Sequence, residues 1–467
     1  MPSTTFTVRP NAGFSLADLP NLQPGDNLHI KGLQNLRNGG DVREPNLSSM
    51  RLNRLHLAWD RNTNSTNSAE EVLGALRPHR DLTGFRLSGY RGMNIPNWMT
   101  DISILGRLVD VKLMNCINCS QLPPLGKLPF LNTLYLSQMT NVKYIDDSPY
   151  EISTENAFPS LTEMTLFDLP NLERVLRIEG VEMLSQLSKL SIQSIPQFEL
   201  PSLPSVKEVY VGGETEEDID HEASFLRDIA GKMPNLKELM IDAFHQLTVL
   251  PNELSSLRSL EELYIIDCNK LESIPNNVFY GLISLRILSF VICHSLNSLP
   301  QSVTTLTSLQ RLIIHYCPEL ILPANMNMLN SLREVSIMGG DRRRGIYNGL
   351  EDIPLLQNLS LRDFPSLRSL PDWLGDTLSL QELEISKFPK LTSLPDNFDQ
   401  LENLQKLCID RCPRLVNRLA RRTGEDWYKI AHVPILSLRL ESDVVHPINE
   451  EEYSNSDNEL DMEVDEP

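Results

Sequence analysis

The amino-acid sequence predicts an α/β repeat solenoid whose strands form one parallel sheet, and three observations support this. The chain has 467 residues, which is beyond the size at which a single hydrophobic core usually stops growing. A leucine pattern, L-x-x-L-x-L, recurs along most of it, as in LEELYI beginning at Leu260. Cysteine or phenylalanine, and then proline, recur at fixed distances after that pattern.

The leucine pattern begins fifteen times, with an average spacing of about 25 residues. A period of about 20 to 29 residues with this pattern is the signature of leucine-rich repeats. The spacing is irregular in the first half and nearly constant from residue 236 onward. We expect about fifteen irregular repeats, starting at residues 52, 82, 108, 131, 161, 187, 206, 236, 260, 285, 309, 332, 356, 380 and 404.

Each repeat is expected to contribute one strand and a return connection. Alternate side chains of a strand point to opposite faces of the sheet, so the spaced leucines turn inward and the residues between them face solvent. One repeat cannot bury its apolar face alone, but stacked neighbours bury it continuously. The predicted fold is a leucine-rich-repeat horseshoe with a concave parallel sheet.

The residue eight positions after each repeat start is expected to be buried. This position holds Cys116, Cys268, Cys293, Cys317, Cys412, Phe244, Phe364, Phe388, Met139 and Leu169. Buried cysteine acts as a small apolar residue with a weak S–H donor. Cys119 completes a C-x-x-C with Cys116, but two further ligands at zinc spacing are missing, so these cysteines are interpreted as structural.

Composition and charge indicate where the repeat array begins and ends along the chain. Residues 441–467 carry eleven Asp or Glu and no Lys or Arg, which is typical of disorder. A solenoid also needs a cover over its last repeat, here with Trp427, Ile430 and Val433. The predicted organisation is a disordered N-terminus (1–18), an N-terminal cap with an entry strand near Leu28–Ile30 (19–48), the repeat array (49–415), a C-terminal cap (416–440) and an acidic disordered tail (441–467). An acidic loop and short helix are predicted within 213–233.

Several function classes are disfavoured. The net charge of −20 opposes nucleic-acid binding, which needs a basic stripe. We find no apolar run of about 18 residues that could span a membrane, and no secretory signal. Seven cysteines, an odd number, suit a reducing compartment, so we expect the cytoplasm or nucleus.

Catalytic and cofactor motifs are not found in the sequence. There is no G-x-x-x-x-G-K-[ST], G-x-G-x-x-G, H-E-x-x-H or G-x-S-x-G, patterns that carry phosphate, dinucleotide, zinc and acyl-transfer chemistry. The sequence predicts no enzyme, no cofactor and no metal site. The remaining functional feature is the solvent-facing side of the strands.

A protein-binding surface is therefore predicted on the concave sheet. Aromatic residues and arginine supply interface anchors, and neighbouring charges set specificity. The residues assigned to it are Trp59, Tyr135, Phe167, Tyr210, Tyr264, Asp267, His315, Tyr316, Arg362, Asp363, Glu384 and Asp410.

Several stretches resemble the leucine-rich-repeat region of plant intracellular immune receptors, the coiled-coil NLR-type disease resistance proteins. The N-terminal stretches are LNRLHLAWD (52–60), EEVLGALRPHRDLTGFRLSGYRG (70–92) and IPNWM (95–99). They are followed by CINCSQLPPLGKLPFLNTLYLSQM (116–139), and GEDWYKIAHVP (424–434) resembles the family's closing segment. The resemblance covers about residues 20–435.

The resemblance implies recognition of a pathogen effector or a guarded host protein in plant innate immunity. In a full-length receptor it also implies restraint of a nucleotide-binding switch domain, in cis or in trans. Nucleotide binding is not carried over, because the phosphate-binding pattern is lacking. The alternative is a substrate-recognition subunit of a ubiquitin ligase, or another repeat scaffold, although residues 1–50 lack the amphipathic helix that an adaptor would bind.

Overall fold

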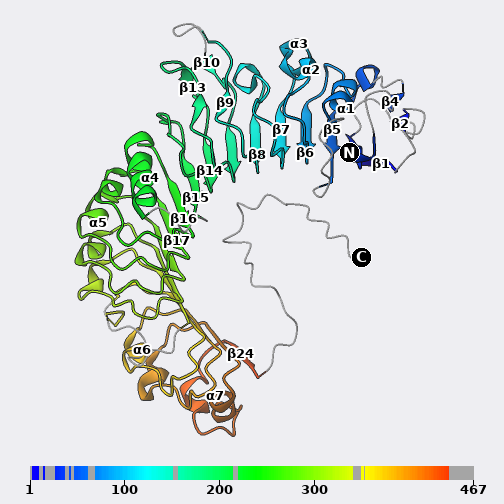
Figure 1. Ribbon diagram of the computed structural model, residues 1–467. Coiled ribbons are helices and arrows are strands. Elements are labelled where there is room, and N and C mark those ends of the chain that lie inside the picture. Colours follow the sequence, from blue (N-terminus) through cyan, green and yellow to red (C-terminus); the bar gives the residue numbers. More distant parts are fainter. Residues whose placement is uncertain are drawn as a thin grey trace. The chain divides into compact units, whose positions relative to one another are not determined.

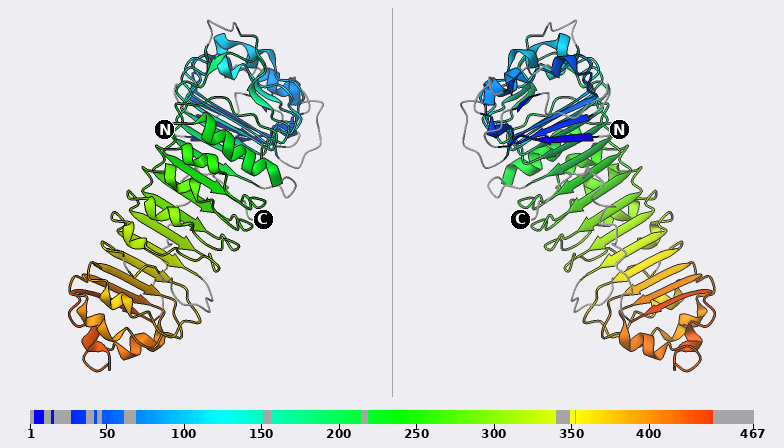
Figure 2. Two further views of the ribbon diagram at one scale, coloured as in Figure 1. Left: turned by 90° about the vertical axis from the view of Figure 1, so that its left-hand side faces the viewer. Right: turned by 90° about the vertical axis from the view of Figure 1, so that its right-hand side faces the viewer.

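The structure is a computed structural model that describes residues 3–9, 14–15, 27–36, 42–43, 47–60, 69–150, 156–213, 219–339, 349–351 and 353–440. The chain divides into two compact units. The first comprises residues 1–245 with 253–260, and the second comprises residues 246–252 with 261–467. In each unit a parallel sheet lines one side and short helices and turns lie on the other (Figures 1 and 2).

The sheet of the first unit is built from parallel strands paired in a constant register. Their order across the sheet follows the chain. The strands are β1 (Ser3–Thr7), β3 (Asn27–Lys31), β5 (Arg54–Ala58), β6 (Gly84–Ser88), β7 (Asp110–Met114), β8 (Thr133–Ser137), β11 (Glu163–Phe167), β14 (Lys189–Gln193), β15 (Glu208–Gly212) and β16 (Glu238–Asp242).

The second unit repeats this arrangement, again with parallel strands in chain order. Its strands are β17 (Glu262–Ile266), β18 (Ile287–Val291), β19 (Arg311–His315), β20 (Glu334–Met338), β21 (Asn358–Arg362), β22 (Glu382–Ser386), β23 (Lys406–Asp410) and β24 (Ile435–Arg439).

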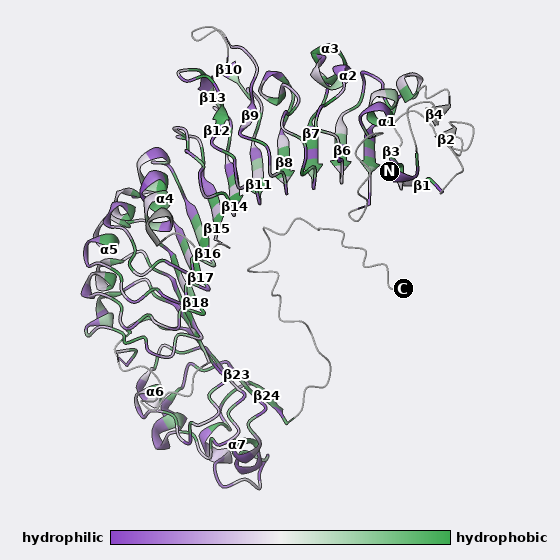
Figure 3. Ribbon diagram, viewed as in Figure 1, coloured by the Kyte–Doolittle hydropathy of each residue, from purple (hydrophilic) through white to green (hydrophobic). Residues whose placement is uncertain are grey.

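Every one of the fifteen predicted repeat starts is followed two residues later by a five-residue strand, so the predicted leucine-rich-repeat fold is confirmed. The second and fourth residues of each strand point into the core. In β17 these are Leu263 and Ile265, both fully buried. The first, third and fifth residues point outward, and we call the surface they form the open face. Each strand thus mixes hydrophobic and hydrophilic residues (Figure 3).

A left-handed residue directly follows most strands. After thirteen of the fifteen repeat strands this residue has a positive φ, as at Asp267 (φ 50°) and Asp363 (φ 61°). Its backbone N–H still donates to the last carbonyl of the next strand, from Asp267 to Val291 at 2.8 Å and from Asp363 to Ser386 at 2.9 Å. The turn therefore extends the inter-repeat ladder by one hydrogen bond while it directs the chain away from the sheet.

The next position holds the cysteine or phenylalanine noted in the sequence. All ten residues predicted there are buried, with at most 4% of their surface exposed. The thiol of Cys317 lies 3.3 Å from the carbonyl oxygen of His315, and that of Cys412 lies 3.3 Å from that of Asp410. The thiol thus donates a weak hydrogen bond to the carbonyl oxygen at the end of its own strand.

Short helices and 3-10 turns supply the return connections. In the first unit they are η2 (Leu33–Asn35), η4 (Leu47–Ser49), α1 (Ala69–Ala75), α2 (Asn97–Thr100), α3 (Ile102–Leu105), η5 (Leu125–Lys127) and α4 (Ile219–Lys232). The others are η6 (Asn252–Ser256), α5 (Asn277–Gly281), η7 (Gln301–Thr305), η8 (Met326–Met328), α6 (Trp373–Asp376), η9 (Asp396–Gln400), α7 (Pro413–Arg418) and η10 (Trp427–Lys429).

Small two-stranded pairs lie outside the main sheet of the first unit. Each pair is parallel. The pairs are β2 (Phe14–Ser15) with β4 (Val42–Arg43), β9 (Tyr144–Asp146) with β12 (Arg174–Leu176), and β10 (Asn156–Ala157) with β13 (Glu182–Met183).

The insert predicted within 213–233 contains the helix α4. Its buried residues Phe225, Leu226, Ile229 and Ala230, and Met233 directly after it, follow the helical spacing of three and four residues. The helix is therefore part of the core of its unit. The acidic loop predicted before it lies largely outside the described residues.

The N-terminal expectation was wrong for residues 3–7, which form β1 instead of lacking structure. Strand β1 pairs along its whole length with β3, the strand that covers the predicted entry segment. Phe6 is the single large apolar residue of STTFT, too little for a sequence pattern to reveal a strand. The strand forms because its backbone hydrogen bonds to β3. The predicted acidic tail, 441–467, lies outside the described residues.

The segment after the last predicted repeat adds one further strand, β24, which pairs with β23. Of the residues expected to cover the core, Ile430 and Val433 are buried and Trp427 is half-buried. The inward residues of β24, Leu436 and Leu438, are half-exposed, unlike those of the preceding strands.

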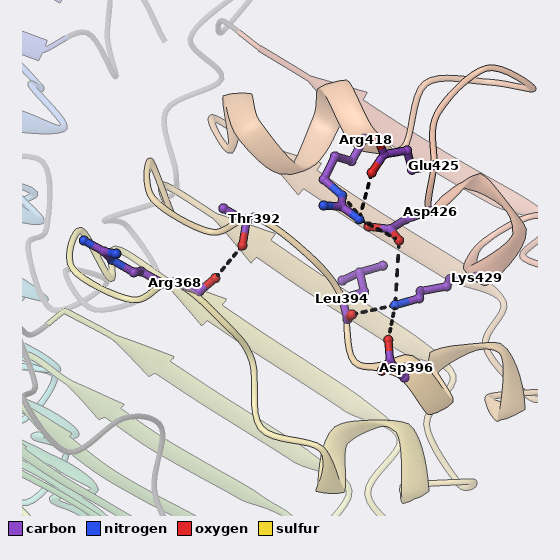
Figure 4. A network of polar contacts seen from close by, with 8 residues as sticks. All are labelled: Arg368, Thr392, Leu394, Asp396, Arg418, Glu425, Asp426 and Lys429. Atoms are coloured by element: carbon purple, nitrogen blue, oxygen red, sulfur yellow. Dashed lines mark hydrogen bonds and ion pairs between the residues drawn. The ribbon is translucent and has the colours of Figure 1, made fainter.

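An ion-pair network centred on the buried Lys429 and Asp426 holds this closing segment (Figure 4). Lys429 is 2% exposed, and its Nζ donates to the carbonyl oxygen of Leu394 at 3.0 Å and to Asp396 Oδ1 at 2.9 Å. Asp426, 4% exposed, lies 3.8 Å from the same ammonium and accepts a 2.8 Å hydrogen bond from Arg418 Nε. The network ties η10 to the preceding repeat at Leu394 and Asp396.

Placing a charge at the cysteine position should destabilise the array. Cys293 is fully buried, and hydrogen bonding with Cys317 and burial both raise the pKa of its thiol. Cys293→Asp should cost about 3 kcal/mol or more of unfolding free energy, because a buried carboxylate has no counter-ion there. Cys293→Ala should cost about 1 kcal/mol. Denaturant unfolding measures both, with Cys408→Asp at a half-exposed position as the milder control.

Removing Asp426 should open the closing segment. Asp426→Ala removes the buried carboxylate that accepts from Arg418 Nε and lies 3.8 Å from Lys429 Nζ, while Lys429 keeps Asp396. The loss of this charged hydrogen bond should cost about 2 to 3 kcal/mol. Faster amide hydrogen exchange in β23 and β24 would report this loss. Glu425→Ala is the matched control, because Glu425 pairs with Arg418 at 3.2 Å from an exposed position and should contribute less than about 1 kcal/mol. Equal exchange in the two variants would contradict the assigned role of Asp426.

Candidate protein-binding surface

The open face of the second unit carries a groove of about 810 Å³ across strands β18 to β23. Most of its lining comes from outward strand positions, so consecutive repeats place these side chains about 4.8 Å apart. The lining includes four residues predicted from the sequence: His315, Tyr316, Arg362 and Glu384. A groove of this kind is the natural starting point for a recognition site.

Charges in the groove are paired between neighbouring strands. Arg311 Nε lies 2.9 Å from Glu334 Oε2, and Lys406 Nζ lies 3.1 Å from Glu382 Oε2. Arg362 forms an ion pair with Glu384. Each pair fixes long side chains before any partner arrives, which lowers the entropy cost of ordering them on binding.

Ser360 joins the Arg362–Glu384 pair into a triad. Its hydroxyl donates to Glu384 Oε2 at 3.2 Å and accepts from Arg362 Nε at 3.2 Å. Arg362 and Glu384 belong to adjacent strands, so the triad presents a fixed positive and negative group at the groove centre. It could orient a complementary polar group of a protein ligand.

His315 is held neutral beside this triad. Burial and the positive charge of Arg362 lower the pKa of His315 to about 4. Its Nε2 lies 2.9 Å from the hydroxyl oxygen of Ser336 on the next strand. The imidazole therefore offers hydrogen bonding without charge at neutral pH.

Tyr316 crosses one repeat to reach the next. A Cβ on Gly339 would lie 2.1 Å from Tyr316 Cδ1, so the ring rests where Gly339 has no side chain. Its hydroxyl lies 3.4 Å from Asp363 Oδ2. Burial and Asp363 raise the pKa of Tyr316. The ring remains 36% exposed and provides the aromatic edge of the groove.

The other predicted residues of the second unit lie outside the groove lining. Tyr264, on the outward side of β17, donates to Glu262 Oε2 at 2.6 Å, and Asp267 follows the same strand. Asp410, at the end of β23, lies 3.2 Å from Arg411 Nε. Tyr264 and Asp410 lie on other parts of the open face, and Asp267 lies at the turn after β17.

In the first unit, Tyr135, Phe167 and Tyr210 occupy outward positions and are half-buried. Tyr210 donates to Asp242 Oδ2 at 2.9 Å. Trp59 does not belong to the open face, contrary to expectation. It is 5% exposed and packs edge-on against Tyr90, with ring centroids 5.5 Å apart. The residue after β5 turns into the core, where a large apolar ring is more stable.

The sequence analysis missed much of the groove, because it selected aromatic and charged residues near the strand ends. The residues missed include Arg311, Glu334, Ser336, Ser360, Glu382, Lys406 and Cys408. All seven are first or third residues of their strands. Reading every outward position in register would have identified them.

The described part of the chain contains no group of three or more His, Cys, Asp or Glu residues able to hold a metal ion. Cys116 and Cys119 are both buried and free. Burial raises the pKa of Cys116 to about 12 and that of Cys119 to about 11, so both thiols are protonated. No helix within the described residues is long and apolar enough to cross a bilayer.

Known proteins share the repeat pattern. Residues 15–139 match the family described as R13L1/DRL21 leucine-rich repeats. The disease resistance protein RGA2 of Solanum bulbocastanum is 34% identical over 282 residues, which cover 58% of this chain and 26% of that protein. The repeats resemble those of plant disease resistance proteins.

Two further comparisons extend this similarity. The putative disease resistance protein RGA1 of the same species is 29% identical over 58% of this chain and 27% of its own length. The chain thus spans about a quarter of the curated relatives it matches. Among solved structures, the leucine-rich repeat domain of the type III effector XopL is 23% identical over 54% of this chain and 76% of that one, with a TM-score of 0.38.

The free energy of unfolding should fall as the pH is lowered and His315 becomes protonated. The unfolded imidazole has an ordinary pKa of 6.5 and the folded one about 4, so below pH 6.5 the unfolded state binds more protons. The His315 contribution is therefore complete above pH 6.5 and is lost as pH falls towards 4. The His315→Gln variant should show a shallower loss of unfolding free energy over that range.

Arg362→Gln provides a companion measurement. Removing the guanidinium takes away one cause of the lowered pKa, so the His315 pKa, followed by NMR, should rise. An unchanged pKa would show that burial alone sets it.

Proposed function

We propose that this chain is a protein-binding module of plant innate immunity that recognises a pathogen effector or a guarded host protein. Similarity to RGA2 supports the immune role, and the preordered groove on the open face supports recognition by direct contact. The observation that carries the proposal is this combination of disease-resistance-type repeats with a groove that contains three ion pairs between neighbouring strands. We propose a non-catalytic role, and the seven free thiols suit the cytoplasm or nucleus.

The relatives RGA2 and RGA1 are about four times longer than the matched region. In a full-length receptor, the array would also restrain a nucleotide-binding switch domain. Recognition and restraint would then use different parts of the repeat surface, since a partner must reach one while the switch occupies the other.

Alanine at Tyr264 and Tyr316 should weaken recognition without unfolding the array. Tyr264 lies on the outward side of β17, and Tyr316 lies after β19 at the groove edge. Buried interface aromatics typically contribute about 2 kcal/mol or more, so Tyr264→Ala with Tyr316→Ala should reduce binding to a cognate effector or guarded protein about thirtyfold or more. Binding is measured by calorimetry, and thermal unfolding confirms folding.

The competing view is that the 213–233 insert recognises the partner. Deleting α4 would remove buried core residues such as Leu226 and Ile229, so the better probe is Arg227→Glu on its exposed side. Full binding by the folded tyrosine double variant, with loss in Arg227→Glu, would move recognition to the insert.

A further inference from the structure

The open face of the first unit carries a row of four basic side chains, two of which are cations without an ion-pair partner among the described residues. The central residues of strands β3, β5, β6 and β7 are His29, His56, Arg86 and Lys112. The strand register places each directly opposite the next, so the row crosses four strands at about 4.8 Å per step.

Few acids lie near this row. Among the outward positions of these four strands, the one carboxylate is that of Asp110, and its Oδ2 lies 3.7 Å from Arg54 Nη1. Arg86 has a buried Nε without a hydrogen-bond partner, and His29 has a buried Nε2 in the same condition. Lys112 lies 6.0 Å from the centre of the Tyr135 ring. The row therefore retains donors that nothing in the described part of the chain uses.

Other cations on the open face form ion pairs with carboxylates on the next strand. Lys189 on β14 lies 2.8 Å from Glu208 Oε2, and Arg311 on β19 lies 2.9 Å from Glu334 Oε2. A chain with net charge −20 has ample carboxylates to neutralise Arg86 and Lys112. Unpaired, partly buried cations lower stability, so their persistence as a row indicates a binding role.

His29 and His56 form a neutral stacked pair beside the charged side chains of Arg86 and Lys112. Their rings stack with centroids 3.8 Å apart and an interplanar angle of 14°. Burial, Lys31 and Arg86 lower the pKa of His29 to about 4, and burial, His29, Arg86 and Lys31 lower that of His56 to about 2. The row already repels added positive charge, and an incoming anion would relieve that repulsion.

We propose that the open face of strands β3, β5, β6 and β7 binds a short carboxylate-rich segment of a protein partner, with Arg86 and Lys112 as its two charge contacts. Arg86 offers a planar donor pair for one carboxylate, and Lys112 a point charge for a second. Acidic residues two apart in an extended segment are separated by about 6.6 Å, which flexible side chains can match to adjacent strands.

A short acidic segment fits better than a nucleic acid. The same open face turns acidic a few strands further on, at Glu163, Glu208, Glu238 and Asp242. A long polyanion extending along the sheet would meet these carboxylates, whereas a segment of four or five residues would end before them. This site is separate from the groove of the second unit and does not depend on what that groove recognises.

The test uses a fluorescein-labelled peptide of alternating Glu and Ser, and its Gln–Ser counterpart, in anisotropy titrations with the full chain. We expect the Glu peptide to bind and the Gln peptide not to bind. Arg86→Gln and Lys112→Gln should each weaken binding about tenfold, and raised salt should weaken it further. Lys189→Gln is the matched control, because that cation is already paired, and it should change binding less than twofold.

Three results would overturn the proposal. Equal binding of the Glu and Gln peptides would remove the carboxylate requirement, and an equal loss in Lys189→Gln would reduce the effect to net charge. Tighter, Arg86-dependent binding of a single-stranded oligonucleotide would assign the row to nucleic acid.

A second readout separates binding from structure. Because Arg86 is an unpaired cation, Arg86→Gln should leave the melting temperature unchanged or raised. It should also raise the pKa values of His29 and His56, measured by NMR. A lowered melting temperature would show that Arg86 has a structural role and would contradict the proposal.

Discussion

The structure depends on one constraint: no repeat can bury its own apolar side chains, so each must hydrogen bond to its neighbours in the same register. The parallel ladder fixes which strand residues face inward. The left-handed residue after most strands keeps one more N–H in that ladder, at Asp267 and Asp363 among others. The buried cysteine or phenylalanine follows because the chain, once turned, passes directly over the core. The residues proposed for recognition are the outward side chains, which the ladder aligns but does not need for its own hydrogen bonds.

Sequence reasoning succeeded where the constraint repeats. The fifteen strands were predictable because leucines at fixed spacing have no other common explanation, and the buried cysteine position followed from the same count. It failed at the ends, where the constraint is relaxed. Strand β1 has one large apolar residue, Phe6, and the inward leucines of β24 are half-exposed. Neither segment contains the full pattern, and both are ordered by backbone pairing with a predicted strand, β1 with β3 and β24 with β23. Their own residues do not reveal that pairing.

The open face was less predictable because its residues follow no period. Once the register is known, ion pairs between residues directly opposite each other on neighbouring strands, such as Arg311 and Glu334, can be predicted from the sequence. Diagonal contacts cannot, since the Arg362–Glu384 pair depends on side-chain direction as well as on register. Trp59 shows the opposite error: its type suggested an interface anchor, but the turn after its strand directs it inward against Tyr90.

Two glycines on the sheet shape the surface by leaving space for a neighbour. Arg54 passes over Gly84, whose added Cβ would lie 2.7 Å from Arg54 Cγ, and reaches towards Asp110. Tyr316 passes over Gly339 to Asp363 in the same way. A methyl group at either glycine would displace a side chain that is itself unchanged and break a contact two strands away. Related arrays with identical exposed side chains can therefore display different surfaces, and diversity in recognition can arise at positions that contact no ligand.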